Sequence, residues 1–232
     1  ETTLLTKKEV KLISEITSLC KENNIIIIAD EIISCYRDNL AGYMFDNKIE
    51  ADLYCLGKGM ANGLPIGLLM GKASLMNCFE DIFFSGTFQG ETLTLVVAKK
   101  VLEIYKRDSV CEKLISRGKY LDDKLNQLIR ENQLSSLLSF KGRNTWKIWD
   151  INLKDEKIFY ELKSLMIQTL ARHGILSIGS NNINYSHNDN EIESIISGYD
   201  KLFKLINYIQ NTETSYAEYL DCKPIKALFT VR

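Results

Sequence analysis

The sequence predicts an α/β protein in which a doubly wound, mostly parallel sheet is followed by a smaller α+β domain. Residues 25–29 are continuously apolar and mostly β-branched, which is typical of a strand buried on both faces of a parallel sheet. A helical pattern precedes this run, and Asp30 and Glu31 follow it, at the strand end where such sheets bind ligands. From about residue 134 the pattern changes to strand–helix–strand–helix.

The composition excludes several classes of protein. The 232 residues suffice for one large domain or two smaller ones, and we expect the boundary between residues 1–133 and residues 134–232. The 45% hydrophobic and 25% charged residues are the ordinary mix of a globular protein, unlike a disordered or collagen-like chain. A net charge of −1 gives no strong attraction to nucleic acid or acidic membranes. The sequence shows neither an apolar run of ~20 residues nor a signal peptide, so we expect a cytoplasmic protein without nucleic-acid or membrane partners.

The first expected element is a helix that begins at a capping box. Thr6 offers a hydroxyl to one free backbone amide, and Glu9, three residues later, offers a carboxylate to another. Four apolar residues then recur at i, i+4, i+7 and i+8 on one helical face, namely Leu12, Ile16, Leu19 and Cys20. The helix ends before the strand expected over residues 25–29.

Two further strands and two long helices follow in the large domain. The second strand, over residues 52–56, ends in a Gly-Lys-Gly turn, and a third strand is expected over residues 66–70. A polar, glycine-flanked loop covers residues 85–90. Apolar residues then recur at helical spacing within residues 97–105 and again within residues 121–129, which predicts two helices.

The small domain begins with an aromatic-rich strand over residues 145–151. A helix around residues 162–170 is ended by His173-Gly174, and a short strand is expected over residues 175–178. Asn188 and Glu191 form a second capping box, which predicts the start of a last helix.

The six cysteines are expected to be free thiols, and no metal is expected. None of them forms a C-x-x-C pair, and a chain of this length does not need disulfides for stability. The two histidines, His173 and His187, are not near a cysteine at ligand spacing.

Asp30 and Lys58 are the candidate chemical groups, because each stands at the end of a predicted strand. Neighbouring strand ends can place a carboxylate and an amine on opposite sides of one small ligand. Desolvation would lower the pKa of a lysine in such a turn and make it a nucleophile for a carbonyl. Taken singly, a strand-end aspartate is more often a turn residue, and an exposed lysine is more often merely solvated. A Walker-B-like magnesium site is the rival interpretation, but the sequence lacks the P-loop that it requires.

Three segments carry more specific patterns. Residues 29–37 read A-D-E-I-I-S-C-Y-R, residues 52–67 read D-L-Y-C-L-G-K-G-M-A-N-G-L-P-I-G, and residues 85–93 read S-G-T-F-Q-G-E-T-L. In this order they resemble the A-D-E-V-x-x-G-[FY]-R, D-x-x-x-x-G-K-x-x-x-x-G-x-P-x-[GA] and G-T-[FL]-x-G-[NE] segments of class III pyridoxal-phosphate aminotransferases. Cys35 stands where that family usually has glycine. The third segment is most similar to the glutamate-semialdehyde aminomutase group. Residues 184–187 resemble the S-x-x-H segment of that group.

This resemblance implies a fold-type-I transferase that binds pyridoxal 5′-phosphate and transfers an amino group to or within a small carbonyl substrate. Lys58 would form a Schiff base with the cofactor and shuttle a proton, and Asp30 would pair with the pyridinium nitrogen. Ile32 would pack on the face of the ring. Thr87 would hydrogen-bond the cofactor phosphate of the neighbouring subunit, which implies a homodimer. The implied small-molecule partners are an amino donor and a carbonyl acceptor.

The family also has a first half, with a phosphate loop and a ring-stacking aromatic residue, that this sequence does not contain. The resemblance therefore implies the C-terminal part of a family member, with an incomplete, mixed and mostly parallel sheet and a small α+β domain. Such a sheet exposes an edge and an apolar face, so we expect this chain alone to be inactive. A non-catalytic remnant or partner subunit is the alternative. The acceptor stays open between a keto acid, glutamate semialdehyde and a polysaccharide precursor, and Glu91 and His187 receive no role.

Overall fold

The computed structural model describes residues 7–226 and divides the chain into two compact units, Glu1–Ile115 and Ser116–Arg232. The capping box predicted at Thr6 lies outside the described residues. The domain boundary expected between residues 133 and 134 falls just after a long helix, α5 (Val110–Glu131), and stays a prediction.

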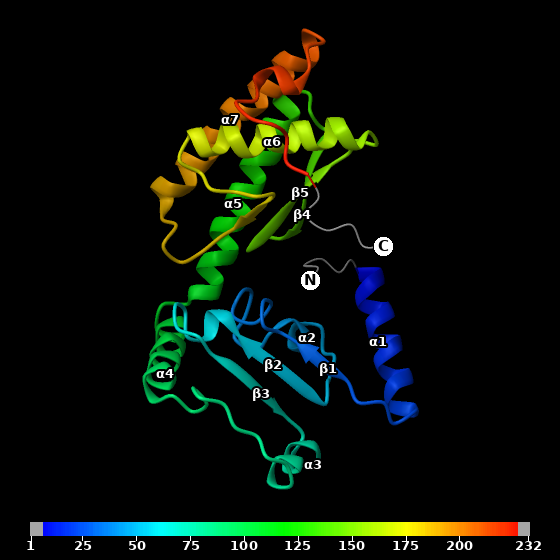
Figure 1. Ribbon diagram of the computed structural model, residues 1–232, viewed down its shortest axis with the longest axis vertical. Helices are drawn as coiled ribbons and strands as arrows, with labels where there is room; N and C mark the ends of the chain where they lie inside the picture. Colours follow the sequence, from blue (N-terminus) through cyan, green and yellow to red (C-terminus); the bar gives the residue numbers. More distant parts are fainter. Residues whose placement is uncertain (1–6, 227–232) are drawn as a thin grey trace. The chain divides into compact units, whose positions relative to one another are not determined.

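The sheet of the first unit contains β1 (Ile28–Asp30), β2 (Leu53–Gly57) and β3 (Gly67–Gly71), in the order β1-β2-β3 (Figure 1). β1 runs parallel to β2, whereas β2 runs antiparallel to β3, so the sheet is mixed. The strands predicted over residues 52–56 and 66–70 are confirmed to within one residue as β2 and β3.

Helices and a small core complete the first unit. Its helical elements are α1 (Lys7–Glu22), α2 (Tyr43–Asp46), η1 (Lys58–Met60), α3 (Ala73–Met76), η2 (Asn77–Glu80) and α4 (Thr92–Arg107). Five buried residues, Cys35, Tyr36, Met60, Ala61 and Ala98, form the core cluster beside these elements. Leu102 and Tyr105 of α4 pack against this cluster, which anchors the helix to the segment that follows β2.

The burial expected on both faces of residues 25–29 is wrong, whereas the apolar face expected to be exposed on an incomplete sheet is present. Only the end of the apolar run forms a strand, and Ile25, Ile26 and Ile28 are each more than half exposed. The apolar stripe of α1 is exposed as well, with Ile16 at 50% and Leu19 at 58%. Periodicity identifies the side chains that share a face, but burial needs a second surface against that face. Within residues 7–226, nothing covers these side chains fully.

The second unit combines a three-stranded antiparallel sheet with long helices (Figure 1). The strands, in the order β4-β5-β6, are β4 (Leu138–Arg143), β5 (Trp146–Ile151) and β6 (Ser180–Asn182). Most of α5 belongs to this unit, together with α6 (Glu156–Arg172), α7 (Asp189–Asn211) and η3 (Tyr216–Tyr219). None of the helices within residues 7–226 has the length and apolar composition needed to cross a membrane.

Tyr199 of α7 lies at the centre of this second core and is fully buried. Its ring centroid is 5.8 Å from that of Phe140 in β4. The Trp149 indole N–H donates a 2.7 Å hydrogen bond to the Tyr199 hydroxyl, which donates a 2.7 Å hydrogen bond to Oδ1 of Asn181. A buried polar group left without a partner costs about 1–3 kcal/mol, so this chain of bonds fixes α7 against β5 and β6.

The helix ends predicted in this unit are confirmed, but one strand is not. His173 is the C-cap of α6, Gly174 follows it at φ +76°, and the capping box of Asn188 and Glu191 begins α7. The strand predicted over residues 175–178 is wrong, because the ladder with β5 starts only at Ser180. The apolar side chains of that run lie outside the sheet, with Leu176 94% exposed and Ile178 82% exposed.

Candidate functional site

The parallel pairing of β1 and β2 brings Asp30 and Lys58 to the same end of two neighbouring strands. Asp30, the last residue of β1, is in register with Cys55 of β2. β2 ends at Gly57, and Lys58 comes directly after it as the first residue of η1. Adjacent strands lie about 4.8 Å apart, so one small molecule can meet side chains from both ends.

Lys58 has an unusual backbone and an exposed side chain. Its φ of +43° lies in the left-handed region, which residues other than glycine rarely adopt and which is enriched at functional sites. Its carbonyl oxygen accepts a 3.3 Å hydrogen bond from the Asn62 N–H, which closes the turn after β2. Within residues 7–226, the Lys58 ammonium group makes no ion pair. The amine is therefore available to a ligand.

Asp30 and Ile32 surround a short turn at the end of β1. The Asp30 carboxylate is exposed, and its Oδ1 accepts a 3.1 Å hydrogen bond from the Ile32 N–H. Ile32 is half-buried, and a Cβ placed on Gly57 would lie 3.7 Å from Ile32 Cγ2. This is ordinary van der Waals distance, so Ile32 packs against the strand end that leads to Lys58, whereas the same Cβ would lie only 3.0 Å from the Ile66 carbonyl oxygen.

Glu31 fixes this turn from the buried side, and the sequence analysis did not predict it. The side chain is 1% exposed, and its carboxylate accepts hydrogen bonds from the N–H groups of Tyr43 at 2.9 Å and Met44 at 2.6 Å. The Ser34 hydroxyl donates to the same carboxylate. The Glu31 N–H also donates a 2.9 Å bond to the Cys55 carbonyl in β2. The side chain and the backbone of Glu31 are therefore both fixed by hydrogen bonds, which holds the turn that carries Asp30 and Ile32 in place.

Gly42 makes this arrangement sterically feasible. Its φ is +91°, and a Cβ added there would lie 2.8 Å from the Glu31 carboxyl carbon, closer than real Cβ contacts allow. A glycine is therefore needed at position 42 both for its backbone conformation and for the space that Glu31 occupies. The sequence signals for this arrangement are the acidic residue after Asp30 and the glycine itself. Neither signal reveals that Glu31 accepts a hydrogen bond from Tyr43, twelve positions later.

Among the described residues, Thr87 and Glu91 make no hydrogen bond or ion pair with Asp30 or Lys58, and His187 belongs to the second unit. Thr87 is exposed in the loop between η2 and α4. Glu91 is the N-cap of α4, where hydrogen bonds from Thr94 and from the Leu93 N–H lower the pKa of its carboxyl group. His187 precedes α7 in the second unit, and burial lowers its pKa.

Two residues next to the site remain neutral at physiological pH. Cys35 and Tyr36 belong to the core cluster, and burial raises the pKa of the Cys35 thiol to about 11 and that of the Tyr36 hydroxyl to about 12. Both values lie far above neutral pH, so neither group is a candidate acid or base. The chemically competent groups at the strand ends are the Asp30 carboxylate and the Lys58 amine.

Comparison with known proteins gives one family. The family model for Aminotransferase class-III matches residues 5–186. The chain is 27% identical over 212 residues to glutamate-1-semialdehyde 2,1-aminomutase of Wigglesworthia glossinidia brevipalpis, a match that covers 85% of this chain and 48% of that protein. It is 34% identical over 107 residues to acetylornithine aminotransferase of Listeria monocytogenes serotype 4b (strain F2365), which covers 46% of this chain and 28% of that protein.

Solved structures give the same fold. An omega-transaminase from Sphaerobacter thermophilus matches with a TM-score of 0.77 at 17% identity, over 84% of this chain and 48% of that one. The FumI protein of Sphingopyxis sp. MTA144, in its PLP internal aldimine form, matches with a TM-score of 0.76 at 18% identity, over 91% of this chain and 50% of that one. The chain thus spans about half the length of the aminomutase, the omega-transaminase and the FumI protein that it matches.

Proposed function

Because the chain belongs to the class III aminotransferase family, we propose that it supplies the C-terminal part of an enzyme that moves an amino group to or within a small carbonyl substrate. The cofactor of this family is pyridoxal 5′-phosphate. The observation that carries the proposal is the placement of an exposed carboxylate and an exposed amine at the ends of two adjacent parallel strands. A transaminase and an aminomutase are both compatible with these two groups.

The strand ends fit the chemistry of this cofactor. When bound, its protonated pyridine ring acts as a sink for the electrons released at the substrate carbon. Asp30 is suited to hold the proton at the ring nitrogen, because its exposed carboxylate makes one hydrogen bond with its own turn and has oxygen lone pairs left for a second donor. The half-buried Ile32 side chain, from the same turn, offers an apolar contact to the ring face.

Lys58 is the group proposed to bind the cofactor's aldehyde carbon covalently. Its exposed side chain has no competing ion pair within residues 7–226, and its backbone is held by the turn to Asn62. The same Nζ atom would take up and return a proton during the amino transfer. Lys58 and Asp30 are thereby assigned the catalytic and cofactor-binding roles, and Ile32 a cofactor-binding role.

Thr87 and the apolar surface of the first unit point to further protein. Thr87 is exposed and does not join the other three residues, which agrees with a role at the cofactor phosphate of a second subunit in a homodimer. Ile25, Ile26 and Ile28 are each more than half exposed at β1 and its approach. At about 25 cal/mol per Å², such faces favour association with another surface. We therefore propose that amino transfer requires protein surface beyond this chain.

Lysine replacement in the whole protein tests the proposed role directly. Lys58→Ala should abolish amino transfer, while Lys48→Ala is the matched control. Lys48 is also exposed, and its φ of +55° is similar to the φ of Lys58. Both variants therefore replace an exposed lysine with a left-handed backbone conformation in the same unit. Equal activities of the two variants would contradict the assignment of Lys58.

Replacement of Asp30 separates the binding role from the catalytic role. Asp30→Asn should keep the yellow colour of the bound cofactor but slow turnover by about 100-fold or more, because a neutral amide no longer holds the ring nitrogen protonated. An unchanged rate would remove Asp30 from the mechanism. Failure of the whole wild-type protein to bind pyridoxal phosphate would favour the alternative of a non-catalytic family member.

A further inference from the structure

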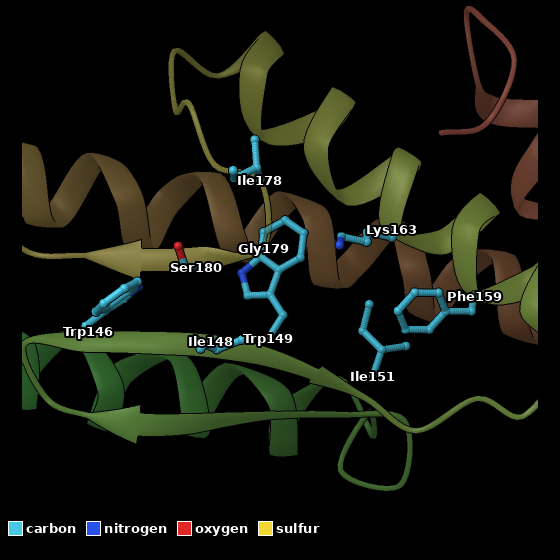
Figure 2. A pocket seen from close by; sticks show the side chains of 9 residues that line it. All are labelled: Trp146, Ile148, Trp149, Ile151, Phe159, Lys163, Ile178, Gly179 and Ser180. Atoms are coloured by element: carbon cyan, nitrogen blue, oxygen red, sulfur yellow. The ribbon is translucent and has the colours of Figure 1, made fainter. Parts of the chain in front are cut away.

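A cavity of about 260 Å³ is lined entirely by residues of the second unit (Figure 2). β5, α6, and the loop that leads into β6 supply its walls. Its lining residues are Trp146, Ile148, Trp149, Ile151, Phe159, Lys163, Ile178, Gly179 and Ser180. The lining is mostly aromatic and aliphatic, with a single charged side chain. Nothing in the proposed amino-transfer chemistry uses it.

The wall formed by Trp149 is rigid. The indole N–H of Trp149 is bonded to the buried Tyr199 hydroxyl at 2.7 Å, and its backbone N–H donates a 2.9 Å bond to the Gly179 carbonyl. The ring therefore cannot swing into the cavity without breaking a buried hydrogen bond. Figure 2 shows the indole beside the loop at Gly179, with the side chain of Lys163 next to both.

One hydrogen-bond donor that lines this cavity has no acceptor. Within residues 7–226, the ammonium group of Lys163 has neither an ion pair nor a hydrogen bond, although other lysines of the unit do, such as Lys147 with Asp122 at 3.0 Å. The indole nitrogen of Trp146 also makes no hydrogen bond, but it is fully buried and does not reach the cavity. An anion in the cavity would give the Lys163 ammonium group a charge-assisted hydrogen bond.

Gly179 keeps open the space beside the ammonium group. A Cβ at this position would lie 3.6 Å from Lys163 Cε, 3.8 Å from Lys163 Nζ and 3.9 Å from Trp149 Cε3. A side chain at position 179 would therefore occupy the gap between the cation and the indole. At the same loop, Ile178 is 82% exposed, so the apolar lining reaches the surface.

We propose that this cavity binds a small monocarboxylate with an apolar body, such as an arylacetate or a branched aliphatic acid. The carboxylate would accept a hydrogen bond from the Lys163 ammonium group, and the apolar body would contact Trp149, Phe159 and Ile151. The volume lies just below the ~300–1,000 Å³ of sites for drug-sized ligands, so it suits one ring or one branched chain. A cation is disfavoured by Lys163, and a neutral amide would not neutralise its charge.

Trp146 and Trp149 are the only two tryptophans of the chain, so intrinsic fluorescence reports on this cavity. The 232-residue chain is titrated with phenylacetate and, as a neutral analogue of equal shape, with phenylacetamide at constant ionic strength. We expect a saturable change with phenylacetate and at least tenfold weaker binding of phenylacetamide. No saturable change up to about 10 mM phenylacetate, or equal binding of the two probes, would overturn the proposal.

Substitutions on α6 and β5 locate the binding groups. Lys163→Met should weaken phenylacetate binding at least tenfold, and Lys163→Arg should restore it. Lys157 is the control, because it lies on the same helix and its Nζ is 3.9 Å from Oε1 of Glu161, with which it forms an ion pair. Lys157→Met should bind phenylacetate as the wild type does. Trp146→Phe, read from Trp149 fluorescence, should keep the preference for phenylacetate over phenylacetamide, because the buried indole N–H does not reach the cavity. Wild-type affinity in Lys163→Met would refute the site, whereas unchanged binding in Lys58→Ala would show its independence from the amino-transfer proposal.

Discussion

Replacement of Gly42 with alanine tests whether Glu31 holds the turn that carries Asp30. The added Cβ would lie 2.8 Å from the Glu31 carboxyl carbon, so the carboxylate must move away from the N–H groups of Tyr43 and Met44. Hydrogen bonds to a charged group contribute about 1.5–3 kcal/mol each. The left-handed φ of +91° adds about 1–2 kcal/mol of strain for any residue with a side chain.

Gly63→Ala is the control that separates these two costs. Gly63 has a φ of +117° and no atom within 4 Å of an added Cβ, so its replacement introduces strain without displacing a neighbour. Loss of one of the two bonds should make Gly42→Ala less stable than Gly63→Ala by about 1.5–3 kcal/mol. This difference corresponds to roughly 10- to 100-fold faster amide hydrogen exchange at Tyr43 and Met44, measured by NMR. Equal exchange at these amides in both variants would refute the role of Glu31.

Further predictions concern two buried polar groups, the Cys35 thiol and the Tyr199 hydroxyl. Burial raises the pKa of the Cys35 thiol to about 11 from its ordinary value of 9.0. Iodoacetamide at pH 8 should therefore modify the exposed Cys78 well before Cys35, as peptide mass mapping would show. The folded state favours the neutral thiol, so the contribution of this thiol to stability is complete below pH 9 and is lost between about pH 9 and 11. The urea midpoint of the wild type should therefore fall over that range relative to the midpoint of Cys35→Ser. A wild-type midpoint that does not fall relative to this control would contradict the assignment. Tyr199→Phe leaves Trp149 and Asn181 without their shared partner, so the free energy of unfolding should fall by about 2–4 kcal/mol, and an unchanged urea midpoint would contradict the network.

Local chemistry made several elements predictable from the sequence. The capping box of Asn188 and Glu191 begins α7 because both groups act within one helical turn. Asp30 and Lys58 could be placed at neighbouring strand ends because each directly follows a short apolar segment. In these cases the signal and the structure lie within a few residues of each other.

The rest depends on contacts between distant segments. Glu31 looks like an ordinary turn residue until α2 places two N–H groups against its carboxylate. The apolar run over residues 175–178 has strand composition, but pairing with β5 starts later, at Ser180. The stripe of α1 has helical spacing, yet Ile16 is 50% exposed, because spacing does not provide a covering surface.

Borohydride labelling of the whole protein tests the central claim most directly. The protein is loaded with pyridoxal phosphate, reduced with borohydride so that any covalent link to an amine becomes permanent, digested and mapped by mass spectrometry. We predict that the pyridoxyl-phosphate mass is found on the peptide containing Lys58, and that Lys58→Ala removes the label while Lys48→Ala keeps it. A label on another lysine, or stoichiometric labelling of Lys58→Ala, would contradict the assignment of these strand ends as the cofactor site.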